Sequence, residues 1–260
     1  MKHFYAKLTA YVLIATLAVS CKREQLLDTK EPQPIVKTKP VEIASEFDRL
    51  EMAYNEDGLV KQTALSDPRG LLERAQFHYE GGKLATVSGN GVLFTYTYQN
   101  NRLTSIGVYV QPGVMTSIYE FTYQNDILAE RIKRVKLNPS GQFETYSKTI
   151  YQFSTGNLVK TETTFFSAGG APSSKEVVTY TYDDKENTVS DFEQEPFLPV
   201  TLMKNNPVKI VYADAQGENT KTITHSYSYN QFGQPVTRKT IISAIAFGGT
   251  ATDYTISYGK

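Results

Sequence analysis

The chain has 260 residues, 40% of them hydrophobic, which is enough to bury the core of one large all-β domain or two small ones. Lys and Arg number 27, and Asp and Glu also number 27, so the basic footprint of a nucleic-acid-binding protein is absent and no nucleic-acid partner is expected. There are 18 Tyr, 13 Phe and no Trp, a composition suited to the half-buried surface of a sheet, and the one Cys excludes an intrachain disulfide.

Residues 1–20 predict a lipoprotein signal peptide. Two lysines precede an apolar run over residues 8–19, which is too short to span a bilayer stably. The run ends in "LAVSC", small residues directly before the only Cys, and this stretch resembles a lipobox, the cleavage signal of bacterial lipoproteins. The resemblance implies cleavage before Cys21, lipidation of Cys21 and a membrane partner through that anchor. Ala18 departs from the pattern, because Leu is commoner there, and an ordinary secretory signal is the alternative.

Residues 21–45 predict the lipidated Cys and a flexible tether, because they carry three prolines and mixed charges with little periodicity. A single β-hairpin-repeat domain is expected over residues 46–260. The expected location is the bacterial cell envelope, lipid-anchored at the outer membrane on its periplasmic or surface face.

A short unit of aromatic residue, polar turn and apolar residue recurs along this domain. The aromatic residue ends one alternating strand, Asn, Asp or Gly fills a tight turn that demands positive φ, and the apolar residue opens the next strand. Seven units begin at Tyr54, Tyr79, Tyr98, Tyr123, Phe153, Tyr182 and Tyr229. The stretch "GLLERAQFHYE" at 70–80 contains helix formers but runs into the next unit, so it is interpreted as a strand.

These units resemble the YD, or RHS-type, repeat, whose core reads roughly Tyr-x-Tyr-Asp-x-x-Gly-x-Leu. "TYTYDDKEN" at 179–187, "SYSYNQFGQPVTR" at 226–238 and "AYNEDGLVK" at 53–61 carry the resemblance. With "NNPVKIVYAD" at 205–214, the chain resembles uncharacterised bacterial lipoproteins with YD-like repeats over residues 46–260. The Asp is often Gln or Asn, and the Gly is missing in "YQNNRL" and "YQNDIL". The resemblance implies hairpin architecture and an envelope location, and it transfers no activity.

The fold expected from these patterns is an all-β antiparallel meander of about 14–17 strands, forming a twisted, curled sheet built from YD-like hairpins. Whether that sheet closes into a barrel or splits in two stays open. The segment 193–207 breaks the pattern with three prolines and is expected to cross between sheet halves or to close an end.

No catalytic constellation stands out, and no cofactor is expected. There is no G-x-S-x-G elbow, P-loop or dinucleotide fingerprint, and with no Cys left in the domain a structural zinc site is disfavoured. His78 and His225 fit ordinary strand positions. The carboxylates Asp183, Asp184, Glu193 and Glu195 could serve a glycan-processing or other hydrolytic enzyme, but two of them lie in a predicted turn, where Asp is preferred for backbone reasons.

Aromatic residues recur at strand ends with a spacing of two, so pairs of them share one face of the sheet. Such a ladder could stack on sugars or peptide, although core packing is the ordinary explanation. The candidate ligand-binding residues are Tyr96, Tyr98, Tyr123, Tyr182 and Tyr229. The sequence favours a non-enzymatic envelope lipoprotein that binds or scaffolds a protein or polysaccharide, with a hydrolytic enzyme and a purely structural spacer as alternatives.

Overall fold

The computed structural model describes residues 38–111, 113–137, 141–189, 197–245 and 248–259. Sixteen antiparallel strands follow one another along this part of the chain, and no helix occurs in it. The strands are β1 (Pro40–Ala44), β2 (Arg49–Tyr54), β3 (Val60–Asp67), β4 (Gly70–Glu80), β5 (Lys83–Gly89), β6 (Val92–Gln99), β7 (Arg102–Gln111), β8 (Val114–Gln124), β9 (Ile127–Val135), β10 (Glu144–Ser154), β11 (Asn157–Phe166), β12 (Pro172–Glu186), β13 (Asn205–Ala213), β14 (Asn219–Tyr229), β15 (Pro235–Ala244) and β16 (Gly248–Tyr258). The strand interpretation of residues 70–80 is confirmed by β4.

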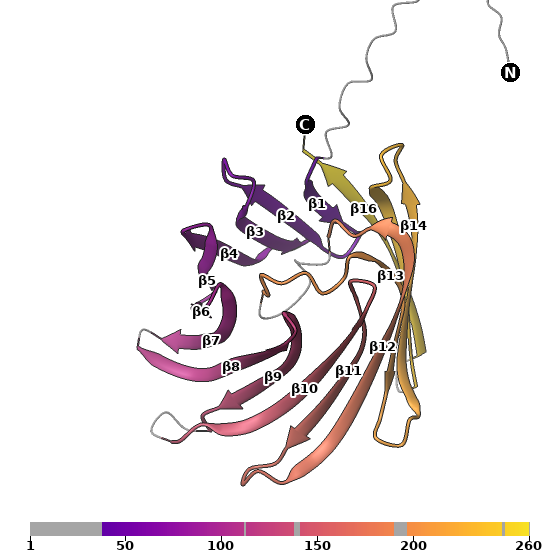
Figure 1. Ribbon diagram of the computed structural model, residues 1–260. Coiled ribbons are helices and arrows are strands. Elements are labelled where there is room, and N and C mark those ends of the chain that lie inside the picture. Colours follow the sequence, from indigo (N-terminus) through magenta and orange to yellow (C-terminus); the bar gives the residue numbers. More distant parts are fainter. Residues whose placement is uncertain (1–37, 112, 138–140, 190–196, 246–247, 260) are drawn as a thin grey trace, which may run out of the picture. The chain divides into compact units, whose positions relative to one another are not determined.

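Each strand pairs with its neighbours in sequence, and β1 pairs with β16, so the sheet closes into a barrel (Figure 1). The closing ladder joins Pro40 to Tyr258 and Ile43 to Ile256. The Gly259 amide then donates to the Lys39 carbonyl at 3.0 Å, which holds the two ends of the described chain side by side.

The expected twisted, curled sheet built from YD-like hairpins is therefore wrong, although the domain is all-β, because the strands close into a barrel. Closure satisfies the backbone groups that an open sheet would leave at two edges. The last part of the segment assigned to the tether contributes to closure, because Pro40–Ala44 form β1. The predicted signal peptide, Cys21 and the tether up to residue 37 lie outside the described residues.

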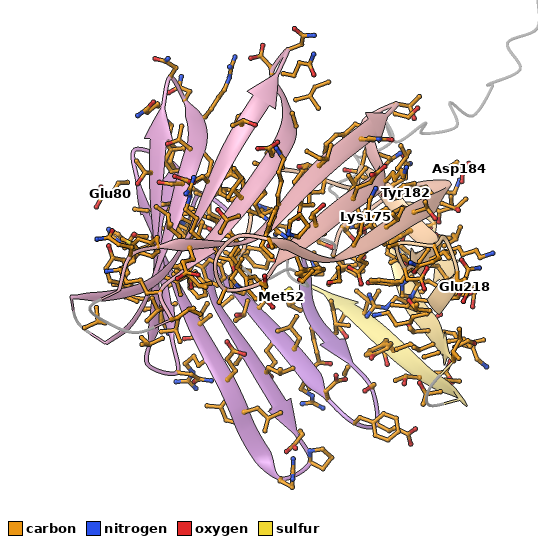
Figure 2. All side chains as sticks on the ribbon, turned by 90° about the horizontal axis from the view of Figure 1, so that it is seen from below. Met52, Glu80, Lys175, Tyr182, Asp184 and Glu218 are labelled. Carbon is orange, nitrogen blue, oxygen red and sulfur yellow. The ribbon has the colours of Figure 1, made fainter. Side chains whose placement is uncertain are left out.

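Alternation along the strands divides the wall into an inner and an outer face. The larger hydrophobic cluster gathers inward side chains of β4–β12 together with residues of the segment 197–203, and a smaller one joins Ile43, Met52, Val189 and Ile256. Figure 2 shows Met52 toward the centre, whereas Glu80, Asp184 and Glu218 lie at the periphery. The described part of the chain has no apolar helix of membrane-spanning length.

Candidate functional site

The repeated aromatic–turn–apolar unit builds one end of the barrel, which we call the floor. At each of the seven units, the strand register shifts immediately before the aromatic residue, as between Thr97 and Tyr98. Such bulges bend and twist a strand. The turn that follows Tyr98 has positive φ at both Asn100 (49°) and Asn101 (65°), which explains the preference for Asn there.

The apolar residues that open the next strands pack together at the floor. Four of the five leucines in this position are buried, namely Leu84, Leu103, Leu128 and Leu158, and the fifth, Leu59, is half-buried. The tyrosines close the layer by donating their hydroxyls to carbonyls near the start of the preceding strand. Tyr98 reaches the Leu84 carbonyl at 3.0 Å and Tyr258 the Pro235 carbonyl at 2.9 Å. Tyr54, Tyr182 and Tyr227 make the same bond to Pro40, Leu158 and Pro207. The floor is thus a hydrogen-bonded layer, with each bond contributing about 1 kcal/mol.

Residues 197–203, between β12 and β13, pack against the inward side chains and thicken the floor. The Leu158 amide donates to the Leu202 carbonyl at 2.8 Å, and the rings of Phe77 and Phe197 meet edge to face with centroids 4.8 Å apart. Tyr96 donates its hydroxyl to the Phe197 carbonyl at 2.9 Å. Residues 197–203 therefore fit the expectation of a segment that closes an end, and residues 193–196 lie outside the described part.

The outer wall carries charged pairs along β8–β12. Arg134 Nε lies 2.7 Å from Glu120 Oε2, and Lys148 Nζ lies 2.6 Å from Glu130 Oε2. The Glu162 carboxylate accepts hydrogen bonds from Lys160 and Lys175, and these bonds lower the pKa of its carboxyl to about 2. A lipid-facing barrel instead presents an apolar band between aromatic girdles.

Above the floor, the lumen holds a cavity of about 450 Å³ lined by inward residues of β9–β16. Its lower lining is closed, since Leu158 is 2% and Leu202 4% exposed. Toward the opposite end, which we call the mouth, the lining residue Ile242 is 36% exposed, so the cavity opens there. This volume falls in the range of about 300–1,000 Å³ that suits small-molecule sites.

The cavity wall is polar where β9–β12 face it. Arg131, Thr149, Thr163 and Glu176 are successive cross-strand neighbours on the inner face, and we call this row the polar rib. The hydroxyls of Thr149 and Thr163 are hydrogen-bonded at 3.0 Å, and both residues are buried. The rib places a guanidinium at one end and a carboxylate at the other, with hydroxyls between them.

The facing strands β14–β16 add a second polar region to the cavity. His225 shares a hydrogen bond of 2.9 Å with the Thr240 hydroxyl, and the Arg238 guanidinium lies 4.6 Å from the Tyr254 ring centroid. Burial and the positive charge of Arg238 lower the pKa of His225 to about 4, so the imidazole is neutral at physiological pH. Burial also raises the pKa of Tyr180 to about 12, so its hydroxyl stays protonated.

The five candidate tyrosines all lie on the inner wall at or near the floor, outside the lining of the 450 Å³ cavity. Tyr96, Tyr98 and Tyr182 use their hydroxyls to hold backbone carbonyls, and Tyr123 packs against the larger hydrophobic cluster. Their role in ligand binding stays a prediction. The spacing of the tyrosines in the sequence does not predict hydrogen bonds from their hydroxyls to backbone carbonyls, so this structural role was not foreseen.

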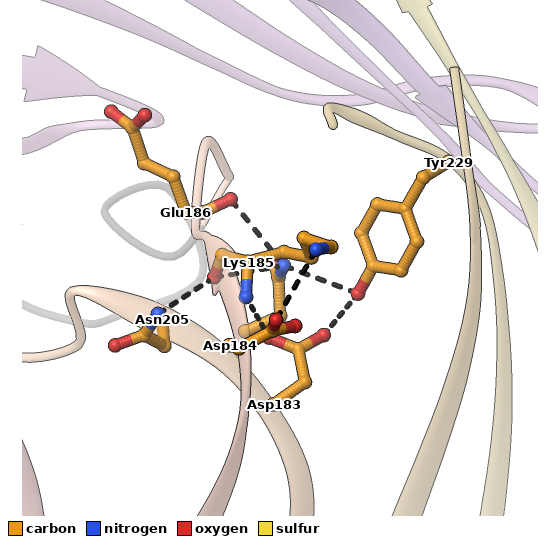
Figure 3. A network of polar contacts seen from close by, with 7 residues as sticks. Asp183, Asp184, Lys185, Glu186, Asn205 and Tyr229 are labelled. Atoms are coloured by element: carbon orange, nitrogen blue, oxygen red, sulfur yellow. Dashed lines mark hydrogen bonds and ion pairs between the residues drawn. The ribbon is translucent and has the colours of Figure 1, made fainter. Parts of the chain in front are cut away.

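The acidic stretch after Tyr182 is not the predicted turn, because β12 continues through it to Glu186, and several of its polar groups are held by hydrogen bonds to neighbouring residues (Figure 3). Tyr229 donates its hydroxyl to Asp183 Oδ2, and Asp183 Oδ1 accepts from the Lys185 amide at 2.9 Å. The buried Asn206 donates to the Tyr229 hydroxyl at 3.3 Å, while Asn205 donates to the Lys185 carbonyl at 3.1 Å. Burial and the Asp183 carboxylate raise the pKa of Tyr229. Asp183 thus ties β12 to β14. Glu193 and Glu195 lie outside the described residues.

Two further features bear on metal or acid–base chemistry. His78 lies on the outer wall, with Nε2 3.6 Å from Glu80 Oε1, whereas His225 lies on the inner wall, so the two histidines do not meet. Within the described ranges, no group of three or more His, Cys, Asp and Glu side chains is placed to hold a metal ion.

The cavity residues that sequence reasoning missed are Arg131, Glu176 and Arg238. Their one signal is polar side chains at the inward positions of alternating strands.

No family model matches the chain, and no curated protein matches it. Among solved structures, a porin-like protein from Bacteroides uniformis ATCC 8492 is similar over 85% of this chain and 96% of its own, with 11% identity and a TM-score of 0.59. A porin-like protein from Bacteroides vulgatus ATCC 8482 covers 86% and 99%, with 14% identity and a TM-score of 0.49, which is too low to carry an argument. At these identities the likeness shows the fold alone.

The assignment to a YD or RHS-like repeat family is therefore wrong. No family model matches the chain, and the structure from Bacteroides uniformis to which it is similar is a porin-like protein. The physical reason is closure: the aromatic–turn–apolar unit gives hairpins, and sixteen strands of them join end to end as a barrel. The quoted motifs identify the turn chemistry of the floor, which any antiparallel barrel with such bulges can share.

Proposed function

We propose that the protein is an envelope lipoprotein whose barrel is a non-enzymatic binding module, holding a small ligand from the envelope in its lumen. The observation that carries this proposal is the cavity of about 450 Å³, closed at the floor and open toward the mouth. A through-channel would need an open floor. The lining of hydroxyls, aromatic rings and a few charged groups is typical of binding sites.

The outer wall supports a barrel that stands in water beside the membrane. Lys148, Lys160 and Lys175 lie on that wall in ion pairs. Each Lys or Arg on the lipid face of a barrel costs about 2–4 kcal/mol at the bilayer midplane. The lipobox-like stretch at Cys21 supports attachment through acyl chains instead, and the likeness to porin-like proteins agrees with an envelope location.

A ligand-capture experiment tests the binding function. The full chain is immobilised and offered the small-molecule and glycan fraction of a bacterial envelope, and retained material is identified by mass spectrometry. Thr161→Phe fills the cavity, whereas Thr179→Phe places the same ring on the exposed outer face of the neighbouring strand. We expect wild type and Thr179→Phe to retain the same ligand and Thr161→Phe to lose it.

Thermal unfolding of each variant separates loss of binding from loss of fold. Retention of nothing by wild type would overturn the proposal, and so would equal retention by a folded Thr161→Phe variant. The lipid anchor has its own test: Cys21→Ala should abolish incorporation of labelled fatty acid into the chain, and unchanged labelling would overturn the anchor.

A further inference from the structure

Arg131 is an unusual side chain to find on the inner wall of the lumen. Its Nη2 makes one long contact to the Thr149 hydroxyl at 3.5 Å, and its guanidinium lies 5.6 Å from the Tyr119 ring centroid. Its Nε is enclosed and has no hydrogen-bond partner among the described residues, and no ion pair joins Arg131 to a carboxylate in that part of the chain. Burying part of a charged group without a carboxylate partner is costly, so this half-buried guanidinium is suited to an anionic group that is not part of the wall.

The rest of the polar rib indicates which other groups a ligand carrying that anion would need. Thr149 and Thr163 provide hydroxyls that can both donate and accept. Glu176 at the far end can accept hydrogen bonds from hydroxyls. The rib crosses three strand spacings from β9 to β12, a span of about 14 Å, which gives room for a ligand longer than one sugar ring.

Aromatic rings lie on the floor side of the rib. Tyr151 on β10 and Tyr180 on β12 line the same cavity and keep protonated hydroxyls, because burial raises the pKa of both phenols. Rings of this kind stack on apolar C–H faces, while their hydroxyls remain donors. The wall thus combines a cation, neutral hydroxyls and ring faces within one cavity.

From this geometry we propose that the lumen selects an acidic sugar, with its carboxylate on Arg131 and its hydroxyls along Thr149, Thr163 and Glu176. This inference rests on the proposed binding function and names its ligand class. A neutral sugar would leave the half-buried Arg131 charge without a counterion. A bare inorganic anion would engage the Arg131 end of the rib and leave the rest of its length unused.

Titration of the full chain with digalacturonic acid, its neutral methyl ester and inorganic phosphate tests the proposal by calorimetry. We expect the acid to bind at least tenfold more tightly than the ester or phosphate. Arg131→Gln should remove that preference, and Arg131→Lys should restore part of it. Arg134→Gln is the matched control, since it removes an arginine from the outer face of the same strand, and it should bind the acid as wild type does.

The outcomes separate the two proposals. Equal binding of acid and ester, tighter binding of phosphate, or an unchanged preference in Arg131→Gln would overturn the acidic-sugar assignment while the binding module stands. No binding of any probe would also overturn this assignment, and the capture experiment above decides the module independently. Circular dichroism of each variant confirms that lost binding is not lost folding.

Discussion

The floor and the mouth of the barrel both consist of connections between antiparallel strands, yet apolar side chains are buried at the floor and exposed at the mouth. At the floor, Leu103 and Leu158 are 3% and 2% exposed under a layer of tyrosine hydroxyls. At the mouth, Leu72 is 49% and Ile245 79% exposed. The repeated unit therefore encodes a stable closed end, and the opposite end is free of that constraint. The polar cavity lies between the two.

The largest expected effect comes from opening the floor. Leu158→Ala leaves a hole in the buried layer and should lower the free energy of unfolding by about 2–5 kcal/mol. Leu72→Ala at the mouth should change it by less than about 0.5 kcal/mol, because the side chain is already largely in water. Urea unfolding of both variants measures the contrast, and equal losses would show that the two ends do not differ as described.

The second effect is a pH dependence of the free energy of unfolding, caused by His225 in the wall between the two ends. The pKa of His225 is lowered to about 4, so the unfolded chain, in which His titrates near 6.5, binds more protons between these values. The free energy of unfolding should therefore fall as pH drops through that window, by about 1–2 kcal/mol between roughly pH 7.5 and 5. His225→Asn should lose this part of the pH dependence.

His78→Asn is the control for that experiment, because His78 is exposed on the outer wall. The free energy of unfolding of His78→Asn should change between the two pH values as that of wild type does. An identical pH dependence in wild type and His225→Asn would mean that His225 is not held neutral by its surroundings.

A smaller effect tests the tyrosine layer. Tyr98→Phe removes the hydroxyl that donates to the Leu84 carbonyl at 3.0 Å and should cost about 0.5–1.5 kcal/mol. Tyr146→Phe removes an exposed hydroxyl near the mouth and should cost almost nothing. Differential scanning calorimetry measures both. If Tyr98→Phe is as stable as wild type, the hydroxyl–carbonyl bonds do not stabilise the floor.

The sequence predicted the hairpin turns that form the floor, but it predicted neither the closure of the wall nor the residues of the cavity. Tyr98, two asparagines and Leu103 identify a hairpin because turn chemistry and alternation are local. Closure depends on the pairing of Pro40 with Tyr258, which no local pattern reports, and Pro40 lies in a segment whose prolines suggested a tether. The polar rib was equally hidden, since Arg131 and Glu176 come from different strands and meet one cavity only after the register of β9–β12 is set.

The most direct measurement concerns the outer wall, on which the account of a water-facing binding barrel depends. The chain has no Trp, so Ile150→Trp gives a single probe on the outer face, between Glu130 and Glu162. The full-length variant in lipid vesicles would be quenched in turn by acrylamide in the water and by brominated acyl chains in the bilayer. We predict quenching by acrylamide and none by the brominated lipid. Strong quenching by the brominated lipid would place this wall in the bilayer and contradict the account.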